Sequence, residues 1–576
     1  MEFRVSGSRG DPEVWRVTPQ DAGRVAALSE ALDRPELVAR LLLARSITTA
    51  AAAEEFFDPD PARLHDPLLM KGVAQAADVL LAAARSGRRI VVFGDYDVDG
   101  VTSVAQLRAA LTRAGADAVA FLPHRLRDGY GLKPDTVRRV LDELAPAVIV
   151  TVDCGITAVE GVACARAAGV EVIVTDHHLV PAELPEGAVV VNPRQPGCGY
   201  PFKDLAAAGV ALKIAQAVAR EAGIRLPTES LLRVACLGTI ADLVPLTGEN
   251  RIIAAAGLSA LAAARAPGLK ALLAESGIEP GRAPTAEEVA FRVAPRLNAA
   301  GRLDTAELAL SLLEERDGAR AAAAARELSL RNGQRRELER RVVAQARERL
   351  ASRFDPEADA VLLAWDAGWH RGVLGIAASR LAREFHRPVL LFGMDGERAT
   401  GSGRSIPGVA LHATLKEIEN LFDEFGGHDQ AVGGSLPAAR LPELCEAARA
   451  LFAARVPREK LSRVREADAD LPLSCADDAL LFLLQGFEPH GMGNPRPVFR
   501  DGPVEAEGDF LPLGEKGLRG RLCHGGASRR AITWEREELG GLLAGARPLE
   551  IHYRLGRDRN GGLQAEILAA RPAPLS

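Results

Sequence analysis

The chain has 576 residues, and its 71 lysines and arginines are outnumbered by 77 aspartates and glutamates, which gives a formal charge of −6 at pH 7. This balance excludes a uniformly basic protein that coats nucleic acid by charge alone, and 47% hydrophobic residues exclude wholesale disorder. Seven cysteines without a Cys-x-x-Cys pair exclude a zinc-finger or disulfide scaffold, and we expect a cytoplasmic chain without a signal sequence or membrane span.

The first expected domain covers residues 1–312 and consists of an N-terminal segment and an α/β domain. Four short β-branched runs alternate there with helical patterns, at 89–93, 147–152, 171–175 and 188–191. Continuous apolar strands separated by helices predict a parallel sheet that is covered on both faces. From about residue 204 to 312 the chain is rich in Ala and Leu, which predicts mostly helix.

Three further parts follow along the chain. Residues 314–352 are almost free of Gly and Pro and predict one long connecting helix, assigned to 313–353. A second, smaller α/β domain is expected over 354–458, with strands near 360–364 and 388–392 and a helix near 373–385. Short segments punctuated by Gly and Pro, with strands near 551–555 and 564–568, favour a β-barrel of the oligonucleotide-binding (OB) type over 465–576.

Acidic residues and histidines gather where strands of the first domain are expected to end. They form four clusters: Asp95, Asp97 and Asp99; Asp153; Asp176, His177 and His178; and Asp242. The carboxyl ends of strands in an open parallel sheet line one crevice, so these clusters should converge. Crowded carboxylates repel one another unless cations lie between them, and oxygen ligands with imidazole suit two Mn²⁺ or Mg²⁺ ions. Such a pair of metals indicates phosphoester hydrolysis.

Two of these carboxylates have a second interpretation. Asp95 is either a metal ligand or the carboxylate that caps its loop or the helix expected to begin near Val101. Asp176 either binds metal or accepts hydrogen bonds that orient the two histidines after it.

The four clusters resemble the motifs of the DHH phosphoesterase family. The resemblance extends over nearly the whole chain through further motifs at 296–302, 368–375, 401–405, 426–433 and 491–497. It implies a bridging and catalytic role for Asp153 and places His178 against the scissile phosphate. It also implies this set of metal ligands: Asp97, Asp99, Asp153, His177 and Asp242.

Substrate contacts are expected in both α/β domains. Gly426 and Gly427 would let the backbone approach a phosphate to which His428 can donate, and Ser402 with Arg404 would grip a terminal phosphate. The resemblance adds these residues to the contacts: Arg125, Arg296, Asn298, Arg302 and Arg380.

The resemblance implies a two-metal exonuclease that degrades single-stranded DNA from 5′ to 3′ in repair, recombination and mismatch repair, and we expect a monomer. It implies single-strand-binding protein as a partner and allows a RecQ-type helicase as another. One alternative is a phosphodiesterase of short oligonucleotides or cyclic dinucleotides, although such relatives generally lack the long helix and the barrel. A catalytically silent replication scaffold is the alternative of another class, and the intact ligand set argues against it.

Overall fold

The computed structural model describes residues 13–125, 127–303, 305–545, 547–558 and 560–573. The chain forms two compact units. The parallel-sheet unit comprises Ala51–Arg335 and Phe487–Pro495. The barrel unit comprises Met1–Ala50, Arg336–Gly486 and Arg496–Ser576. Because the chain passes between the units several times, neither is one continuous stretch of sequence.

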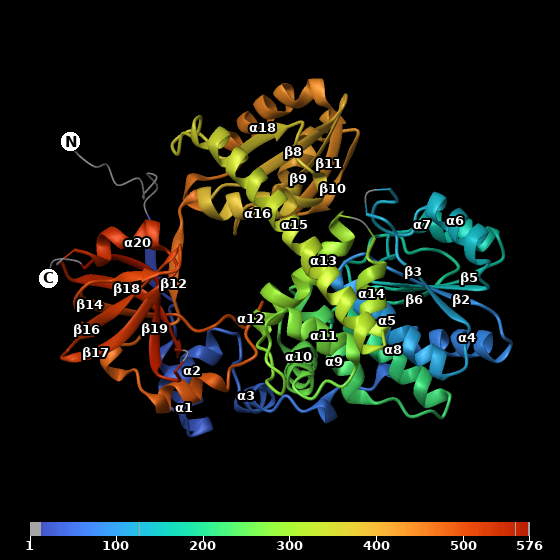
Figure 1. The fold of residues 1–576 in the computed structure, drawn as a ribbon, viewed down its shortest axis with the longest axis horizontal. Helices are drawn as coiled ribbons and strands as arrows, with labels where there is room; N and C mark the ends of the chain where they lie inside the picture. The colour runs from blue at the N-terminus through green and yellow to red at the C-terminus, as the bar shows by residue number, and fades with distance from the viewer. Residues whose placement is uncertain (1–12, 126, 304, 546, 559, 574–576) are drawn as a thin grey trace. The chain divides into compact units, whose positions relative to one another are not determined.

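A five-stranded sheet with the order β3-β2-β4-β5-β6 forms the centre of the parallel-sheet unit, and all its neighbouring strands are parallel (Figure 1). The strands are β2 (Ile90–Gly94), β3 (Ala118–Phe121), β4 (Val148–Val152), β5 (Glu171–Thr175) and β6 (Val189–Val191). The order reverses between β2 and β4, because the chain goes from β2 to one edge and then returns to the other side of it. Such a switch point opens a crevice at the carboxyl ends of the two strands.

Helices cover both faces of this sheet. Val91 and Phe93 pack with α6 (Pro134–Leu144) and α7 (Val159–Ala167), whereas Ile90 and Val92 pack with the helices of the opposite face. Those helices include α4 (Val73–Arg85), α5 (Val98–Arg113) and α8 (Ala207–Glu221). The continuous apolar strands of the sequence are therefore explained by burial on two sides.

Helices continue to the end of the unit. They are α9 (Thr228–Ala241), α10 (Gly248–Leu261), α11 (Pro267–Glu275), α12 (Ala286–Glu288), a π-helical turn at Val289–Val293, α13 (Ala294–Leu303) and α14 (Glu307–Glu314). The long helix α15 (Gly318–Ala351) begins four residues later than the expected start at Glu314. Glu315 accepts from the amides of Arg316 and Asp317, and Asp317 accepts from the amide of Arg320. These local bonds end one helix and cap the next.

The segment Phe487–Pro495 belongs to the parallel-sheet unit although its neighbours in sequence belong to the other. The buried guanidinium of Arg251 donates to the carbonyls of Phe487 and Glu488 at 3.1 and 2.8 Å. The buried amide of Asn494 donates to the carbonyls of Phe487 and Pro489 at 2.7 and 2.9 Å. The amide of Leu246 donates to the carbonyl of Met492 at 2.7 Å, so the segment lies against the loop that follows Asp242.

The barrel unit contains the second α/β domain. Its mixed sheet has the order β10-β11-β9-β8-β7, in which only β7 and β8 are parallel. The strands are β7 (Leu362–Asp366), β8 (Val389–Asp395), β9 (Arg398–Arg404), β10 (Glu424–His428) and β11 (Ala431–Pro437). Helices α16 (Arg371–Phe385), α17 (Leu411–Leu415) and α18 (Leu441–Arg455) pack with it. The parallel pair and α16 were predicted, but the Gly-rich antiparallel strands were not.

The C-terminal region is the expected closed β-barrel. Its strands are β14 (Phe499–Ala506), β16 (Gly517–His524), β17 (Ala527–Thr533), β18 (Leu549–Arg557) and β19 (Leu563–Pro572). They pair in the order β14-β18-β19-β17-β16, and a pairing of β14 with β16 closes the ring. The short strands β13 (Ala469–Asp470) and β15 (Leu511–Leu513) extend it, with α19 (Asp478–Gln485) before it and α20 (Arg536–Leu543) between β17 and β18.

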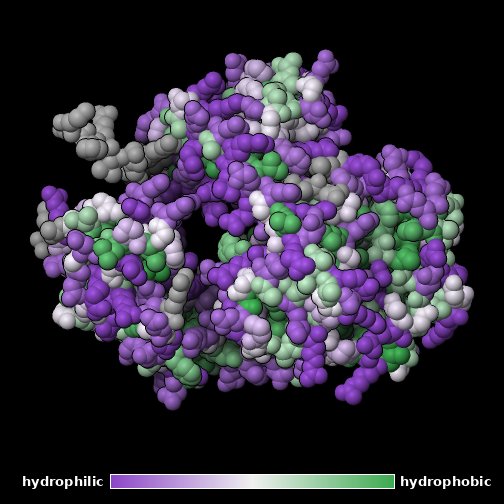
Figure 2. All heavy atoms as spheres, in the orientation of Figure 1, coloured by the Kyte–Doolittle hydropathy of each residue, from purple (hydrophilic) through white to green (hydrophobic). Residues whose placement is uncertain are grey.

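The N-terminal segment joins this unit. Strand β1 (Val14–Val17) pairs in parallel with β12 (Val464–Ala467), and α1 (Ala22–Leu32) and α2 (Glu36–Leu43) follow. Helix α3 (Ala50–Phe57) begins at the boundary and belongs almost wholly to the parallel-sheet unit. Hydrophilic residues predominate on the face shown in Figure 2. Within the described ranges, no individual helix has both the length and the apolarity needed to cross a membrane, and only the sharply bent pair Pro61–Leu69 and Val73–Arg85 satisfies both conditions together.

Candidate metal centre

The loop between β2 and α5 places three carboxylates at the switch point of the sheet. Helix α5 begins at Val98, and Asp97 caps it by accepting from the amide of Gly100 at 3.0 Å. The interpretation in which Asp95 caps a helix that begins near Val101 is therefore wrong. A Cβ atom at Gly100 would lie 2.5 Å from the backbone oxygen of Asp95, so only glycine allows this tight loop.

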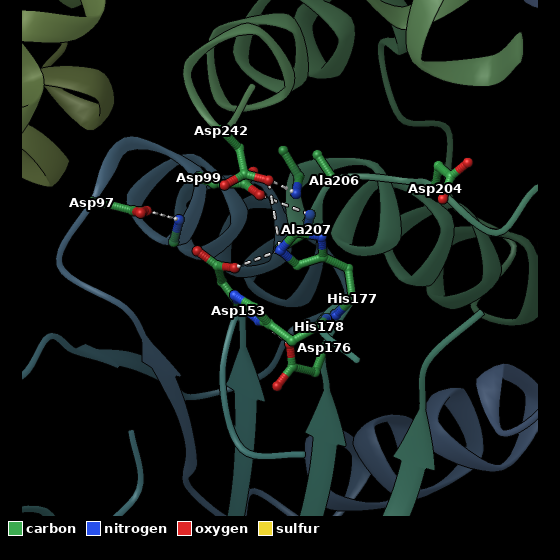
Figure 3. A network of polar contacts seen from close by, with 12 residues as sticks. Asp97, Asp99, Asp153, Asp176, His177, His178, Asp204, Ala206, Ala207 and Asp242 are labelled. Atoms are coloured by element: carbon green, nitrogen blue, oxygen red, sulfur yellow. Dashed lines mark hydrogen bonds and ion pairs between the residues drawn. The ribbon is translucent and has the colours of Figure 1, made fainter. Parts of the chain in front are cut away.

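Asp99 is held by the start of another helix. Its two carboxylate oxygens accept from the amides of Ala207 and Ala208, each at 2.8 Å, at the N-terminus of α8 (Figure 3). The free amides and the dipole of that end favour a negative charge. The carboxylate is thus fixed before any cation binds.

Asp153 and His177 face one another at the ends of β4 and β5 (Figure 3). Asp153 directly follows β4 with φ of 63°, a left-handed conformation that costs energy for a residue other than glycine. The Nε2 atom of His177 lies 3.3 Å from Oδ1 of Asp153 and 3.6 Å from Oδ2 of Asp242, which follows α9. Strand ends and a helix end therefore bring side chains from four chain segments together.

The potential ligand atoms form three overlapping groups, within each of which they lie within 4.8 Å of one another. The groups are Asp95 with Asp97 and Asp153; Asp99 with His177 and Asp242; and Asp153 with His177 and His178. Asp153 and His177 each belong to two groups, as residues between two adjacent cations would. Every residue predicted to bind metal is a member of this cluster.

Electrostatics shows that the cluster fits cations. Burial, and then the charges of its neighbours, raise the pKa of Asp242 to about 9 and that of Asp99 to about 7, and raise the pKa of Asp153 well above its usual range. Among the described residues, Oδ1 of Asp95, Oδ1 of Asp153 and Nε2 of His177 are buried without a hydrogen-bond partner. Burial lowers the pKa of His177 to about 3, so its imidazole is neutral and able to act as a ligand. The donor set suits Mn²⁺ or Mg²⁺.

Asp176 orients the second histidine. Its Oδ1 lies 2.7 Å from Nδ1 of His178 and accepts from the amides of both histidines, while Oδ2 accepts from the amide of Ile156. Burial alone would lower the pKa of His178, but the hydrogen bond and charge of Asp176 raise it to about 9. Burial would likewise raise the pKa of Asp176, yet the bond to His178 lowers it. His178 is thereby held with Nε2 directed away from Asp176.

The predicted substrate residues of this unit lie around the same loop. The guanidinium of Arg125 stacks over the ring of Tyr96 at 4.9 Å, and Oδ1 of Asn298 accepts from the amide of Val98 at 3.1 Å. Arg296 donates to Oγ of Ser329 at 3.0 Å and to the carbonyl of Arg292 at 2.6 Å. Arg302 is half-buried and lies on α13 one turn after Asn298.

The remaining predicted contacts lie in the barrel unit. Ser402 and Arg404 are on β9, opposite Gly433 and Ala431 of β11, and the exposed His428 ends β10. A Cβ atom at Gly375 would lie 2.8 Å from an Nη atom of Arg404, so α16 presents bare backbone to that guanidinium. Arg380 on α16 lies 3.8 Å from Glu339.

Sequence reasoning missed one residue of the site. The hydroxyl of Tyr130 lies 3.3 Å from the carbonyl oxygen of Asp153 and 3.5 Å from Nδ1 of His178. Tyr130 lies after β3, whose apolar run at 118–122 was not predicted as a strand because Val119 is its only β-branched residue. The signal that could have identified it was the aromatic residue within a loop of charged and Gly residues.

Comparison with known proteins gives the family. Sequence models of the DHH family N-terminal domain, the DHHA1 domain and the RecJ OB domain match residues 89–239, 358–454 and 467–566. The single-stranded-DNA-specific exonuclease RecJ of Bacillus subtilis is 38% identical over 84% of this chain and 61% of its own length. That of Salmonella typhimurium is 34% identical over 91% of this chain and 93% of its own length.

Solved structures agree. The crystal structure of RecJ from Thermus thermophilus in complex with Mn²⁺ superposes with a TM-score of 0.82 at 32% identity, covering 98% of this chain and 80% of that one. The same protein has also been solved with Mg²⁺, with a TM-score of 0.76. The chain belongs to the RecJ family of single-stranded-DNA-specific exonucleases within the DHH phosphoesterases.

Proposed function

We propose that this chain hydrolyses single-stranded DNA exonucleolytically from the 5′ end, using two divalent cations, Mn²⁺ or Mg²⁺. The observation that carries the proposal is the convergence of buried, hydrogen-bond-deficient ligand atoms of Asp95, Asp153 and His177 at the switch point of the sheet. The intact cluster in a member of the RecJ family supports the same chemistry.

Each side chain of the cluster has a separate task in this proposal. Bound cations would activate water and stabilise charge on the attacking and leaving oxygens. The carboxylates of Asp97, Asp99 and Asp242 and the imidazole of His177 would hold them, with Asp153 between the two. Asp176 keeps Nδ1 of His178 engaged, so Nε2 of His178 can donate to a phosphoryl oxygen.

We propose that Ser402 and Arg404 make the enzyme act from the 5′ end by binding the terminal phosphate. The hydroxyl and the guanidinium lie two residues apart on β9 and therefore on one face of the strand. A planar guanidinium can bind two oxygens of a terminal phosphate at once. His428 and the backbone of Gly426 and Gly427 would contact the neighbouring phosphate.

The cyclic-dinucleotide alternative is not favoured, because the RecJ OB barrel and the 34-residue helix α15 serve a longer substrate. The silent-scaffold alternative is not favoured either, because each predicted ligand is in the cluster. We further propose a monomeric, cytoplasmic protein that acts in repair, recombination and mismatch repair. Single-strand-binding protein and a RecQ-type helicase are the proposed partners, and a pull-down with each purified protein tests them.

One experiment tests the central proposal. Oligonucleotides labelled at either end, single- or double-stranded, are incubated with Mn²⁺, Mg²⁺ or a chelator. We expect mononucleotides to be released first from the 5′ end of the single strand, and only with metal. The Asp153→Ala variant should bind the strand without cleaving it. Asp204→Asn is the matched control, because this carboxylate pairs with Arg194 at 2.6 Å outside the cluster. Cleavage in chelator, or release from the 3′ end, would contradict the proposal.

A further inference from the structure

Helix α13 is tied to the loop that carries the metal ligands. The first amides of a helix have no partner within the helix and must find one elsewhere. In α5, Asp97 accepts from the amide of Gly100 at 3.0 Å, and the amide of Val98 donates to Oδ1 of Asn298 at 3.1 Å. Val98 stands between Asp97 and Asp99, so the bond from α13 acts on the backbone that joins two ligands.

A second contact reaches the same loop one turn further along α13. A Cβ atom on Gly301 would lie 2.4 Å from the carbonyl oxygen of Tyr96 and 3.3 Å from its Cβ. Residues three apart on a helix share a face, so Asn298 and Gly301 meet successive peptide groups of the loop. Only a residue without a side chain permits this approach.

The other side of Tyr96 is also engaged. Arg125 places its guanidinium 4.9 Å from the centre of the Tyr96 ring. The segment 96–98 therefore has three tertiary contacts from α13 and the loop after β3. These contacts come from residues far apart in sequence and leave little freedom to the backbone between the two carboxylates.

We infer that Asn298 is a positioning residue for the metal-binding loop, assisted by Gly301, and that its role is not to contact the DNA. The inference rests on the proposed function. The carbonyl oxygen of the Asn298 side chain is already used by the protein's own backbone, because it accepts from the amide of Val98. The NH2 group of the same side chain is a donor that a phosphate could accept from, so DNA binding is measured separately from metal binding. Removal of a residue that orients a metal ligand typically weakens metal binding ten- to a hundredfold.

The test measures metal affinity directly, in the full-length protein. Mn²⁺ is titrated into wild type, Asn298→Ala and Asn298→Asp, and free Mn²⁺ is read by electron paramagnetic resonance. Binding of a single-stranded oligonucleotide is measured separately in chelator. We expect Asn298→Ala to weaken Mn²⁺ binding about tenfold, to bind DNA in chelator as wild type does, and to regain activity at saturating Mn²⁺. Asn298→Asp keeps an acceptor for the Val98 amide and should bind Mn²⁺ nearly as wild type does.

Two further variants sharpen the test. Arg296→Ala, on the same helix, should weaken DNA binding in chelator and leave Mn²⁺ affinity unchanged. Gly301→Ala should weaken Mn²⁺ binding independently of Asn298, and it carries the test if Asn298→Ala fails to fold by circular dichroism.

The outcomes separate this inference from the proposed function. If Asn298→Ala and Gly301→Ala both keep wild-type Mn²⁺ affinity, or if Asn298→Ala loses DNA affinity in chelator, the inference is wrong while the nuclease proposal stands. If the wild-type protein itself binds no Mn²⁺ and cleaves nothing, the proposed function fails with it.

Discussion

Replacing Asp153 with Asn should stabilise the metal-free protein while it abolishes hydrolysis. Asp153 is 3% exposed, and its group with Asp95 and Asp97 has ligand atoms within 4.8 Å of one another. At an effective dielectric constant of about 20, two unit charges at 4.8 Å repel by about 3.5 kcal/mol. Protonation of the metal-free cluster relieves part of this repulsion, because the pKa of Asp153 is raised by burial and by the neighbouring carboxylates. We therefore expect a gain of about 2 kcal/mol, or roughly 4 °C in the melting temperature of this unit.

Differential scanning calorimetry with and without Mn²⁺ measures both effects. A ligand at 100 times its Kd stabilises the native state by about 2.7 kcal/mol, so wild type should gain that amount from Mn²⁺ and Asp153→Asn much less. Asp204→Asn, which removes only a half-exposed ion pair, should behave as wild type in both conditions. The reasoning is refuted if metal-free Asp153→Asn melts no higher than wild type, or if Mn²⁺ stabilises both proteins equally.

Three other changes probe the rest of the chain. Arg404→Ala should slow cleavage of a 5′-phosphorylated strand about tenfold more than cleavage of a 5′-hydroxyl strand. Arg398→Ala, at the far end of β9, is the control. Equal losses on the two substrates would show that Arg404 does not bind the terminal phosphate. Burial lowers the pKa of His552 to about 4, below its value of about 6.5 in the unfolded chain, so unfolding is accompanied by binding of a proton. The free energy of unfolding should therefore fall by about 2 kcal/mol as the pH drops from about 6.5 to about 4. In His552→Gln, the midpoints of urea unfolding should lack this part of the pH dependence. Asn494→Ala, which loses two buried hydrogen bonds, should lower the free energy of unfolding by about 2 kcal/mol in a denaturant titration, and an unchanged midpoint would contradict its anchoring role.

The strands of the parallel sheet were predictable because burial on two faces requires continuous apolar runs. β2 and β4 are buried at each position, and their sequences are β-branched almost throughout. β3 was missed because its apolar run at 118–122 contains two alanines and only one β-branched residue, Val119. β9 and β11 were missed because glycine has a low strand propensity. The glycines are present because neighbouring side chains leave no room for a Cβ atom: one at Gly401 would lie 2.2 Å from the ring of Phe392. Propensity is a weak guide where packing against neighbours decides.

The candidate site was predictable to the extent that it follows from topology. Carboxylates that directly follow parallel strands must meet at one edge of the sheet. Asp95 and Asp153, which directly follow β2 and β4, do so and belong to one ligand group. The capping carboxylate could not be identified, because moving the start of α5 from Val101 to Val98 makes Asp97, rather than Asp95, the N-cap of the helix. The hydrogen bond between Asn298 and Val98 joins residues 200 positions apart, so no local pattern encodes it.

The detour of Phe487–Pro495 has a consequence for the order of folding during synthesis. Residues 51–335 can leave the ribosome and collapse around their sheet long before residue 487 is made. Until then, the Arg251 guanidinium can donate to the carbonyl of Phe56 but lacks those of Phe487 and Glu488, and a buried charge with unsatisfied donors is costly. In the loop after Asp242, the amide of Leu246 likewise lacks its acceptor until Met492 has been made. In a nascent chain, the α9–α10 region should therefore stay loosened until Phe487–Pro495 leaves the ribosome. The parallel-sheet unit is then completed only while the C-terminal barrel is being translated.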